Sequence, residues 1–153
     1  MLVNDAYYMK NALEQAKLAA EKGEIPVGAL VVDSESGEIL AAAHNLRESN
    51  KSAIAHAEVL AIEEACKKRG SWRLHGCTLY VTLEPCPMCA GAIINSRIKT
   101  LVFGAYDSKM GSIDSVVNLC DYPYNHKVEV YGGICEDECL SVLQEFFKDL
   151  RKN

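Results

Sequence analysis

One histidine, one glutamate and two cysteines stand at spacings that could form a catalytic metal site. His56 and Glu58 are two residues apart, and Cys86 and Cys89 lie within the pattern P-C-P-M-C over residues 85–89. Zinc binds histidine nitrogen and cysteine sulfur in a tetrahedral set, and a catalytic zinc usually keeps its fourth position for water. The spacing therefore predicts that His56, Cys86 and Cys89 bind one Zn²⁺ ion.

Glu58 is the residue that separates an enzyme from a purely structural zinc site. Zinc lowers the pKa of bound water from about 15.7 to about 7, so that hydroxide is available at neutral pH. A neighbouring carboxylate can accept the proton and pass it on. If zinc-bound hydroxide attacks an amino-substituted heteroaromatic carbon, Glu58 can carry the proton to the ring and then to the departing amine. The predicted chemistry is hydrolytic deamination.

Each half of this pattern is weak when taken alone. An isolated C-x-x-C in an intracellular protein is more often structural zinc or a redox pair. A structural zinc site would leave Glu58 unexplained and would need a fourth ligand. The side chains that could supply it are His44, Cys66, His75 and Cys77. The remaining pair, Cys135 and Cys139, is predicted to consist of packing thiols.

Length and composition bound the class of protein. The chain has 153 residues, of which 49% are hydrophobic, and this is enough for one domain, predicted over 1–153. Its seven cysteines fit reduced thiols and metal ligands, because the chain shows no secretion signal. No stretch has the length to span a membrane, so a soluble, cytoplasmic protein is expected. The net charge of −5 argues against a general nucleic-acid coat.

Hydrophobic periodicity predicts the elements that position these residues. Helices are expected at 5–22, 55–68, 86–97 and 136–152, with Asn4 or Asp5 as the first N-cap and Gly23 as its stop. Strands are expected at 27–32, 38–43, 78–83, 100–105 and 127–131. This order predicts an α/β fold, a three-layer α/β/α sandwich on a five-stranded mixed sheet. Both metal-binding segments lie at predicted helix starts, where partial positive charge favours thiolate over thiol.

The chain resembles the bacterial tRNA-specific adenosine deaminases, a family of the cytidine deaminase superfamily. The pattern H-x-E followed by P-C-x-x-C is the signature of zinc-dependent nucleobase deaminases. Flanking segments narrow the resemblance, and it covers nearly the whole chain. These segments are 26–29, 80–93, 96–98, 102–105 with Asp107 and Lys109, 125–129, and Glu138-Cys139 with Phe146-Phe147.

This resemblance implies a substrate, an assembly and a set of substrate contacts. The substrate would be the wobble adenosine in a tRNA anticodon loop, converted to inosine by a zinc-dependent homodimer. Asn45 matches the asparagine that hydrogen-bonds the target base. Other positions implied to contact the base are Val27, Ala57 and Leu83. Positions implied to hold the flipped nucleotide or its neighbours are Asp107, Lys109 and Phe147.

Two segments depart from the family pattern where it bears on the substrate. Residues 52–55 read S-A-I-A in place of D-P-T-A, and residues 111–114 read G-S-I-D where small residues are usual. The nearest rival function is therefore a deaminase of a free base or nucleotide, of the guanine or cytosine type. Two further rivals are a catalytically idle zinc-stabilised RNA-binding module and a thiol redox protein using Cys86 and Cys89.

Overall fold

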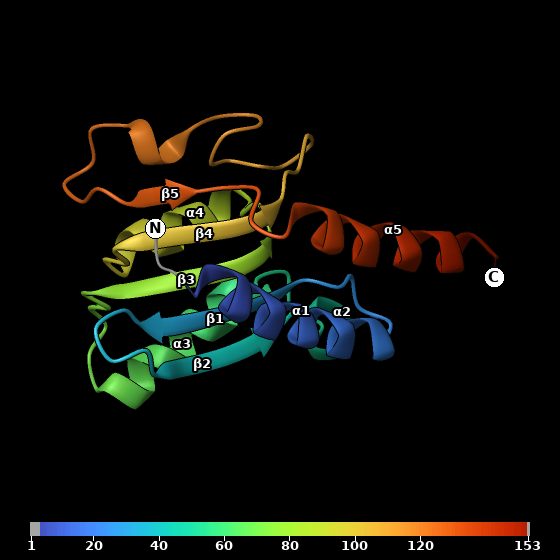
Figure 1. Cartoon of the computed structure of the whole chain (residues 1–153), viewed down its shortest axis with the longest axis horizontal. Coiled ribbons are helices and arrows are strands. Elements are labelled where there is room, and N and C mark those ends of the chain that lie inside the picture. The colour runs from blue at the N-terminus through green and yellow to red at the C-terminus, as the bar shows by residue number, and fades with distance from the viewer. Residues whose placement is uncertain (1–3, 153) are drawn as a thin grey trace.

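The computed structural model describes residues 4–152, and within that range five strands form one mixed sheet (Figure 1). The strands are β1 (Gly28–Asp33), β2 (Ile39–His44), β3 (Cys77–Leu83), β4 (Thr100–Ala105) and β5 (Glu129–Tyr131). They lie in the order β2-β1-β3-β4-β5, with β1 antiparallel to β2 and β3, and with β3, β4 and β5 parallel to one another. The predicted five-stranded mixed sheet is confirmed.

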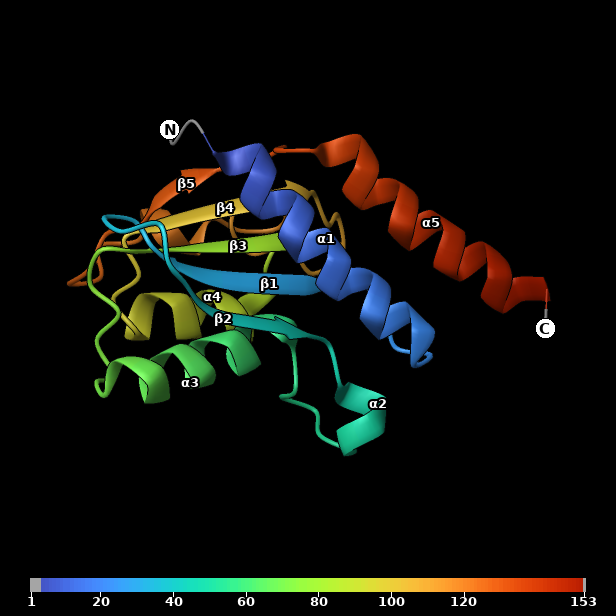
Figure 2. The same cartoon turned by 60° about the horizontal axis from the view of Figure 1, so that its bottom comes forward.

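Helices cover both faces of this sheet, so the predicted three-layer α/β/α sandwich is also confirmed (Figure 2). α1 (Asp5–Glu21) and the first part of α5 (Glu136–Lys152) pack on one face, and α3 (Ala57–Arg69) and α4 (Pro87–Asn95) on the other. The rest of α5 runs past the carboxyl ends of β3 and β4 (Figure 1). Two short elements complete the chain, α2 (Arg47–Asn50) and the 3₁₀ helix η1 (Leu119–Asp121).

Alternation along the central strands divides the core between the two faces. In β3, Leu79 and Val81 pack with α3 and α4, whereas Tyr80 between them packs with α1. Successive side chains of a strand point to opposite faces, and both faces here are covered by helices. Full burial of such a side chain contributes about 1.5–3 kcal/mol. The central strands are therefore apolar on both sides.

Helix α1 approaches β1 so closely that a side chain is excluded between them. A Cβ atom at Gly28 would lie 2.0 Å from the Ala12 carbonyl oxygen. At the start of α1, Asn4 occupies the N-cap position without a side-chain cap hydrogen bond. Asn4 is thus the N-cap residue, one of the two predicted, whereas Asp5 is buried and accepts a hydrogen bond from the Tyr80 hydroxyl at 2.6 Å. Gly23 follows the helix with φ +77°, as predicted.

The largest differences from the sequence-based expectation lie in the connections. α2 and η1 are single turns without a periodic pattern, and β5 is shorter than predicted because it pairs only with β4 at the sheet edge. The predicted domain over 1–153 includes residues 1–3 and 153, which lie outside the described residues. Within residues 4–152, no helix is both long and apolar enough to cross a membrane.

Candidate active site

Two helix starts carry the predicted metal ligands. His56 is the N-cap of α3 and Cys86 the N-cap of α4, and both have extended backbone conformations. Pro87 follows at the first helical position, where the missing N–H costs no helical hydrogen bond. Neither N-cap side chain caps its own helix. Both side chains are consequently free to face each other between the two helix ends.

The three predicted ligands meet at distances that fit one zinc ion. Nδ1 of His56 lies 3.6 Å from Sγ of Cys86 and 3.5 Å from Sγ of Cys89. Tetrahedral coordination with Zn–S of about 2.3 Å and Zn–N of about 2.05 Å requires a sulfur-to-nitrogen separation of about 3.6 Å. The ligand atoms of all three residues lie within 4.8 Å of one another. Their geometry and donor types therefore fit Zn²⁺.

No fourth histidine or cysteine joins this group within the described part of the chain. His44 contacts Gln15 and Lys22, and Cys66 contacts the Trp72 carbonyl. The structural-zinc hypothesis needed one of these side chains, or His75 or Cys77, as a ligand. The arrangement instead leaves one coordination position open, as in catalytic zinc sites.

The two thiols are prepared unequally for a metal. Hydrogen bonding from Cys89, together with contact to His56, lowers the pKa of Cys86 to about 4. The same hydrogen bond and burial raise the pKa of Cys89 well above its usual range. The lowered pKa favours the thiolate form of Cys86, and Zn²⁺ would displace the proton of the Cys89 thiol on binding.

Glu58 reaches the same site from the first turn of α3. Its side chain is 4% exposed, and burial raises its pKa to about 7. A carboxyl with a pKa near the working pH is suited to accept and donate protons. Residues two apart on a regular helix point to different sides, and His56 and Glu58 converge here because His56 is the extended N-cap.

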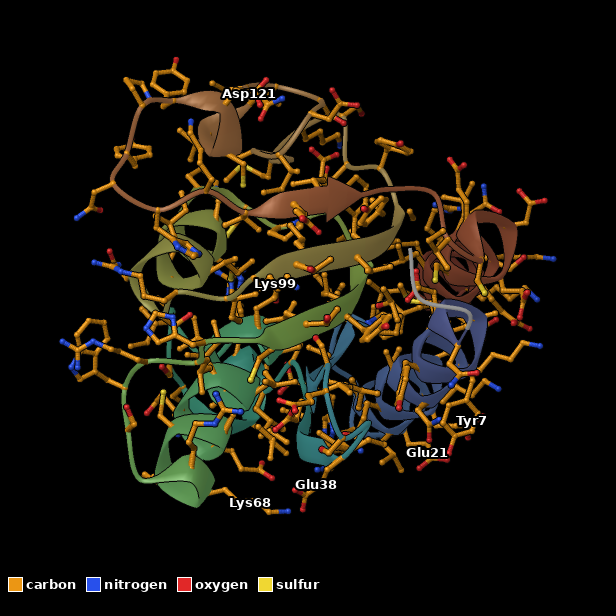
Figure 3. The ribbon with its side chains drawn as sticks, turned by 60° about the vertical axis from the view of Figure 1, so that its left-hand side comes forward. Tyr7, Glu21, Glu38, Lys68, Lys99 and Asp121 are labelled. Atoms are coloured by element: carbon orange, nitrogen blue, oxygen red, sulfur yellow. The ribbon has the colours of Figure 1, made fainter. Side chains whose placement is uncertain are left out.

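A cavity of about 560 Å³ opens over these groups at one end of the sheet. The opposite end carries Glu38, Lys68 and Lys99 (Figure 3), where Lys68 Nζ lies 3.4 Å from Glu38 Oε2. The residues that line the cavity are Ile25, Val27, Asn45, Arg47, Ala53, His56, Ala57, Glu58, Leu83, Glu84, Cys86, Pro87, Met88, Asp107 and Met110. It therefore holds the proton-transfer carboxyl and two of the three metal ligands within one apolar-walled space.

Four of the predicted substrate positions line this cavity close to the helix ends. Val27, Ala57 and Leu83 supply apolar surface. Asn45 is 6% exposed, and its amide group donates to the Ile25 carbonyl at 3.2 Å and accepts from the Arg47 N–H at 3.1 Å. One amide N–H is left for a ligand, because the amide carries two donors.

The three predicted nucleotide contacts have different positions. Asp107 lines the cavity, and its Oδ1 accepts hydrogen bonds from the N–H groups of Lys109 and Met110 in a tight turn. Lys109 is exposed on this turn and lies outside the cavity lining. Phe147 lies on α5, 39% exposed, with its ring against Phe146 and also outside the lining. The cavity thus gathers only Asp107 of the three.

Sequence reasoning missed several cavity residues, and two of them are charged. Arg47 was hidden in a loop, where a single basic residue gives no periodic signal. Glu84 was visible as a carboxylate between a buried strand and a metal ligand, a context that argues against simple exposure. The apolar residues that were missed are Ile25, Ala53, Pro87, Met88 and Met110.

Comparisons with known proteins agree with this geometry. The family of MafB19-like deaminases matches residues 3–151. The tRNA-specific adenosine deaminase of Bacillus subtilis is 54% identical over 99% of this chain and 93% of its own length. That of Aquifex aeolicus is 50% identical, covering 96% of both chains.

Solved structures extend the likeness to the fold. A structure from work on A-to-I editing by tRNA:A34 deaminases at the wobble position is 40% identical, with a TM-score of 0.86. That match covers 90% of this chain and 99% of the other. A guanine deaminase from Nitrosomonas europaea is 27% identical with a TM-score of 0.78, covering 92% of this chain and 83% of the other. The fold is thus cytidine deaminase-like, and the chain belongs to the tRNA-specific adenosine deaminases, within the MafB19-like deaminase family.

Proposed function

We propose that this chain hydrolyses the wobble adenosine of a tRNA anticodon loop to inosine, with one Zn²⁺ ion held by His56, Cys86 and Cys89. One observation carries the proposal. The buried carboxyl of Glu58 lines one cavity together with His56 and Cys86, and the ligand atoms of His56, Cys86 and the buried Cys89 lie within 4.8 Å of one another. The names of the relatives, at 40–54% identity, supply the substrate.

Zinc at this site would supply a Lewis acid that lowers the pKa of a water to about 7. Glu58 takes a proton from the attacking water and gives it to the adenine N1 as the water oxygen bonds to C6. It then moves the proton of the new C6 hydroxyl to the amino group, and the C6–N bond breaks. Adenosine and water become inosine and ammonia, and Glu58 returns to its starting state.

Different residues of the cavity wall make different contacts with the base and its phosphate. Val27 and Leu83 offer apolar surface to the ring, and the remaining N–H of Asn45 offers a hydrogen bond to its polar edge. Arg47 stands among the lining residues as a cation for a neighbouring phosphate. A base in a single-stranded loop is already unstacked, so its extrusion into the cavity costs little.

We extend the proposal to the assembly and the setting. The active form is a homodimer acting on tRNA in the cytoplasm, each chain working as a single deaminase domain. Lys109, exposed beside Met110, then contacts a nucleotide next to the flipped base. Phe147, outside the cavity, reaches only a nucleotide that remains outside it.

A free-base deaminase is the second candidate, favoured by the structural likeness to a guanine deaminase. Its identity of 27% is well below the 54% and 40% of the tRNA enzymes. The two functions share the metal site and differ in what fills the cavity. A substrate test therefore separates them where a zinc test does not.

Inosine formation on an adenosine-wobble anticodon stem-loop tests the proposal. Zinc-loaded protein should convert only the wobble adenosine, and Glu58→Gln should retain one zinc per chain while losing about a thousandfold or more in rate. No conversion by the zinc-loaded parent chain, with ammonia released from free guanine, would overturn it.

A further inference from the structure

Two buried glutamates outside the metal site each hold one loop of the cavity. Glu24 lies between α1 and β1 and is 1% exposed, and Glu84 follows β3 and is 2% exposed. Within residues 4–152, neither carboxylate forms a salt bridge with a lysine or arginine. Both are satisfied instead by N–H groups far away along the chain. A buried carboxylate used in this way fixes the backbone that it binds.

Glu84 organises the loop that carries Asp107. Its Oε2 accepts the N–H groups of Ile113, Asp114 and Ser115 at 3.2, 2.8 and 2.9 Å. Its Oε1 accepts the Asp107 N–H at 3.1 Å and the Ser115 hydroxyl. The loop thus wraps around one carboxylate with its N–H groups pointing inward.

Glu24 holds the opposite loop in a similar way. Its Oε1 accepts the Glu48 N–H at 3.0 Å, and its Oε2 accepts the Ser49 N–H at 2.6 Å. These N–H groups belong to the first turn of α2, where no intrahelical partner exists. α2 carries Arg47 and extends beyond the end of β2 (Figure 2).

Other contacts hold part of each loop, among them the buried side chain of Ile113 and a hydrogen bond from the Leu46 N–H to the Ala55 carbonyl, but the segments that carry Arg47 and Asp107 have little burial of their own. A four-residue helix is too short to persist by its own hydrogen bonds, and α2 contains no buried residue. In the other loop, residues 106–110 are exposed or half-buried. Charge-assisted hydrogen bonds are roughly twice as strong as neutral ones, so the two carboxylates make the strongest polar contacts that hold these segments.

We infer that Glu24 and Glu84 are positioning residues for substrate binding, an inference that rests on the proposed function. Glu24 holds Arg47, and Glu84 holds Asp107, at the cavity before the RNA arrives. Because the loops are already ordered, RNA binding does not bear the entropy cost of ordering them, and the two carboxylates therefore lower KM for RNA. The proton transfer by Glu58 does not involve them.

The test compares Glu24→Gln and Glu84→Gln in the full-length, zinc-loaded protein. Each variant should raise KM for the anticodon stem-loop about tenfold or more while kcat stays within about threefold. Amide hydrogen exchange should become faster in each variant only in the loop that the substituted glutamate binds. Glu84→Gln should expose the amides of residues 107 and 113–115, and Glu24→Gln those of residues 48 and 49.

Two controls separate positioning from general destabilisation. Glu35→Gln, in the exposed β1–β2 turn, changes the same chemical group far from the cavity and should leave KM and exchange unchanged. Leu143→Ala, on the buried face of α5, should lower the thermal midpoint without changing KM. Zinc content is measured throughout, and each variant should retain one ion per chain.

Several results would overturn the inference. They are an unchanged KM in both glutamine variants, a fall in kcat at constant KM, loosening of both loops in either variant, and an equal KM rise in Leu143→Ala. If the parent chain converts no RNA, the proposed function alone fails. Hydrogen exchange can be measured without substrate. If each glutamine variant loosens only its own loop, the assignment of Glu24 and Glu84 to these loops is supported, and any other pattern overturns it.

Discussion

The floor of the cavity (the metal site with Glu58) and its rim (Arg47 and Asp107) are held in place by different kinds of interaction. His56, Glu58, Cys86 and Cys89 sit on the first turns of two regular helices, packed against the sheet core. Arg47 lies on the single-turn helix α2 and Asp107 on an irregular loop, and a buried carboxylate binds each of these segments. The reacting groups are thus tied to the most stable part of the fold, and the groups that meet the RNA to parts that can be altered separately.

Removing a metal ligand should have the largest effect, because it destroys the floor. Cys89→Ser replaces a buried thiol, 0% exposed, with a hydroxyl that zinc binds poorly. Bound zinc should fall from one per chain, and inosine formation should fall to background. Metal analysis and an inosine assay measure both quantities. Retention of one zinc with full activity would show that this thiol is no ligand.

Gly111→Ala should damage the rim while leaving the floor intact. A Cβ at this position would lie 2.4 Å from the Glu84 carboxyl and 2.4 Å from the Asp107 carbonyl oxygen. The loop must shift, at a cost of about 1–3 kcal/mol. KM for RNA should rise about tenfold with zinc retained, as measured by kinetics and metal analysis. Gly91→Ala, with open space at its Cβ, is the matched control and should change neither.

Arg47→Gln should give a smaller, salt-dependent effect at the rim. Loss of one exposed phosphate contact should weaken RNA binding by about 1 kcal/mol, or roughly fivefold, at low salt. The difference from the parent chain should shrink as salt is raised. Titration of a labelled stem-loop at several salt concentrations measures it. Lys99→Gln, at the opposite end of the sheet, should bind like the parent (Figure 3).

The smallest effect concerns pH and the Glu24 anchor. Burial alone would raise the pKa of Glu24, but hydrogen bonds from Ser49 and Glu48 outweigh it and lower the pKa from 4.5. Its contribution to stability is therefore present above about pH 4.5 and lost as the pH falls through the folded-state pKa. Glu24→Gln should be less stable by about 1–2 kcal/mol at pH 7.

Denaturant unfolding of the parent chain and Glu24→Gln across pH measures this difference. The gap in unfolding free energy should narrow as the pH falls below 4.5 and close once the pH is below the lowered pKa of Glu24. A gap that persists at low pH would show that the ionised carboxylate is not the source of the stabilisation.

The division between floor and rim also explains what the sequence could predict. Strand alternation, helix periodicity and the P-C-x-x-C pattern are local signals, and they predicted the sheet, the covering helices and the grouping of His56, Cys86 and Cys89. The anchors of the rim are not local. Glu84 binds residues 29–31 positions away, and Glu24 binds residues 24 and 25 positions away. No periodicity reports such pairs, so α2 and the role of Glu84 were missed.

The same reasoning explains the two segments that depart from the family pattern. Residues 52–55 follow α2, which Glu24 anchors, and residues 113 and 114 bind Glu84 directly. Residues 113 and 114 bind Glu84 through their backbone N–H groups, so these contacts do not depend on which side chains the two residues carry. Changes of side chain at residues 113 and 114 therefore leave the backbone contacts with Glu84 available.

The ratio of kcat/KM for an anticodon stem-loop to that for free adenosine and free guanine tests the central claim most directly. One zinc-loaded preparation is assayed for ammonia release and inosine with all three substrates. Contacts of the rim with the RNA should favour the stem-loop by about a thousandfold or more, because binding energy away from the reacting base lowers the barrier. A free base processed as efficiently as the stem-loop would contradict the account.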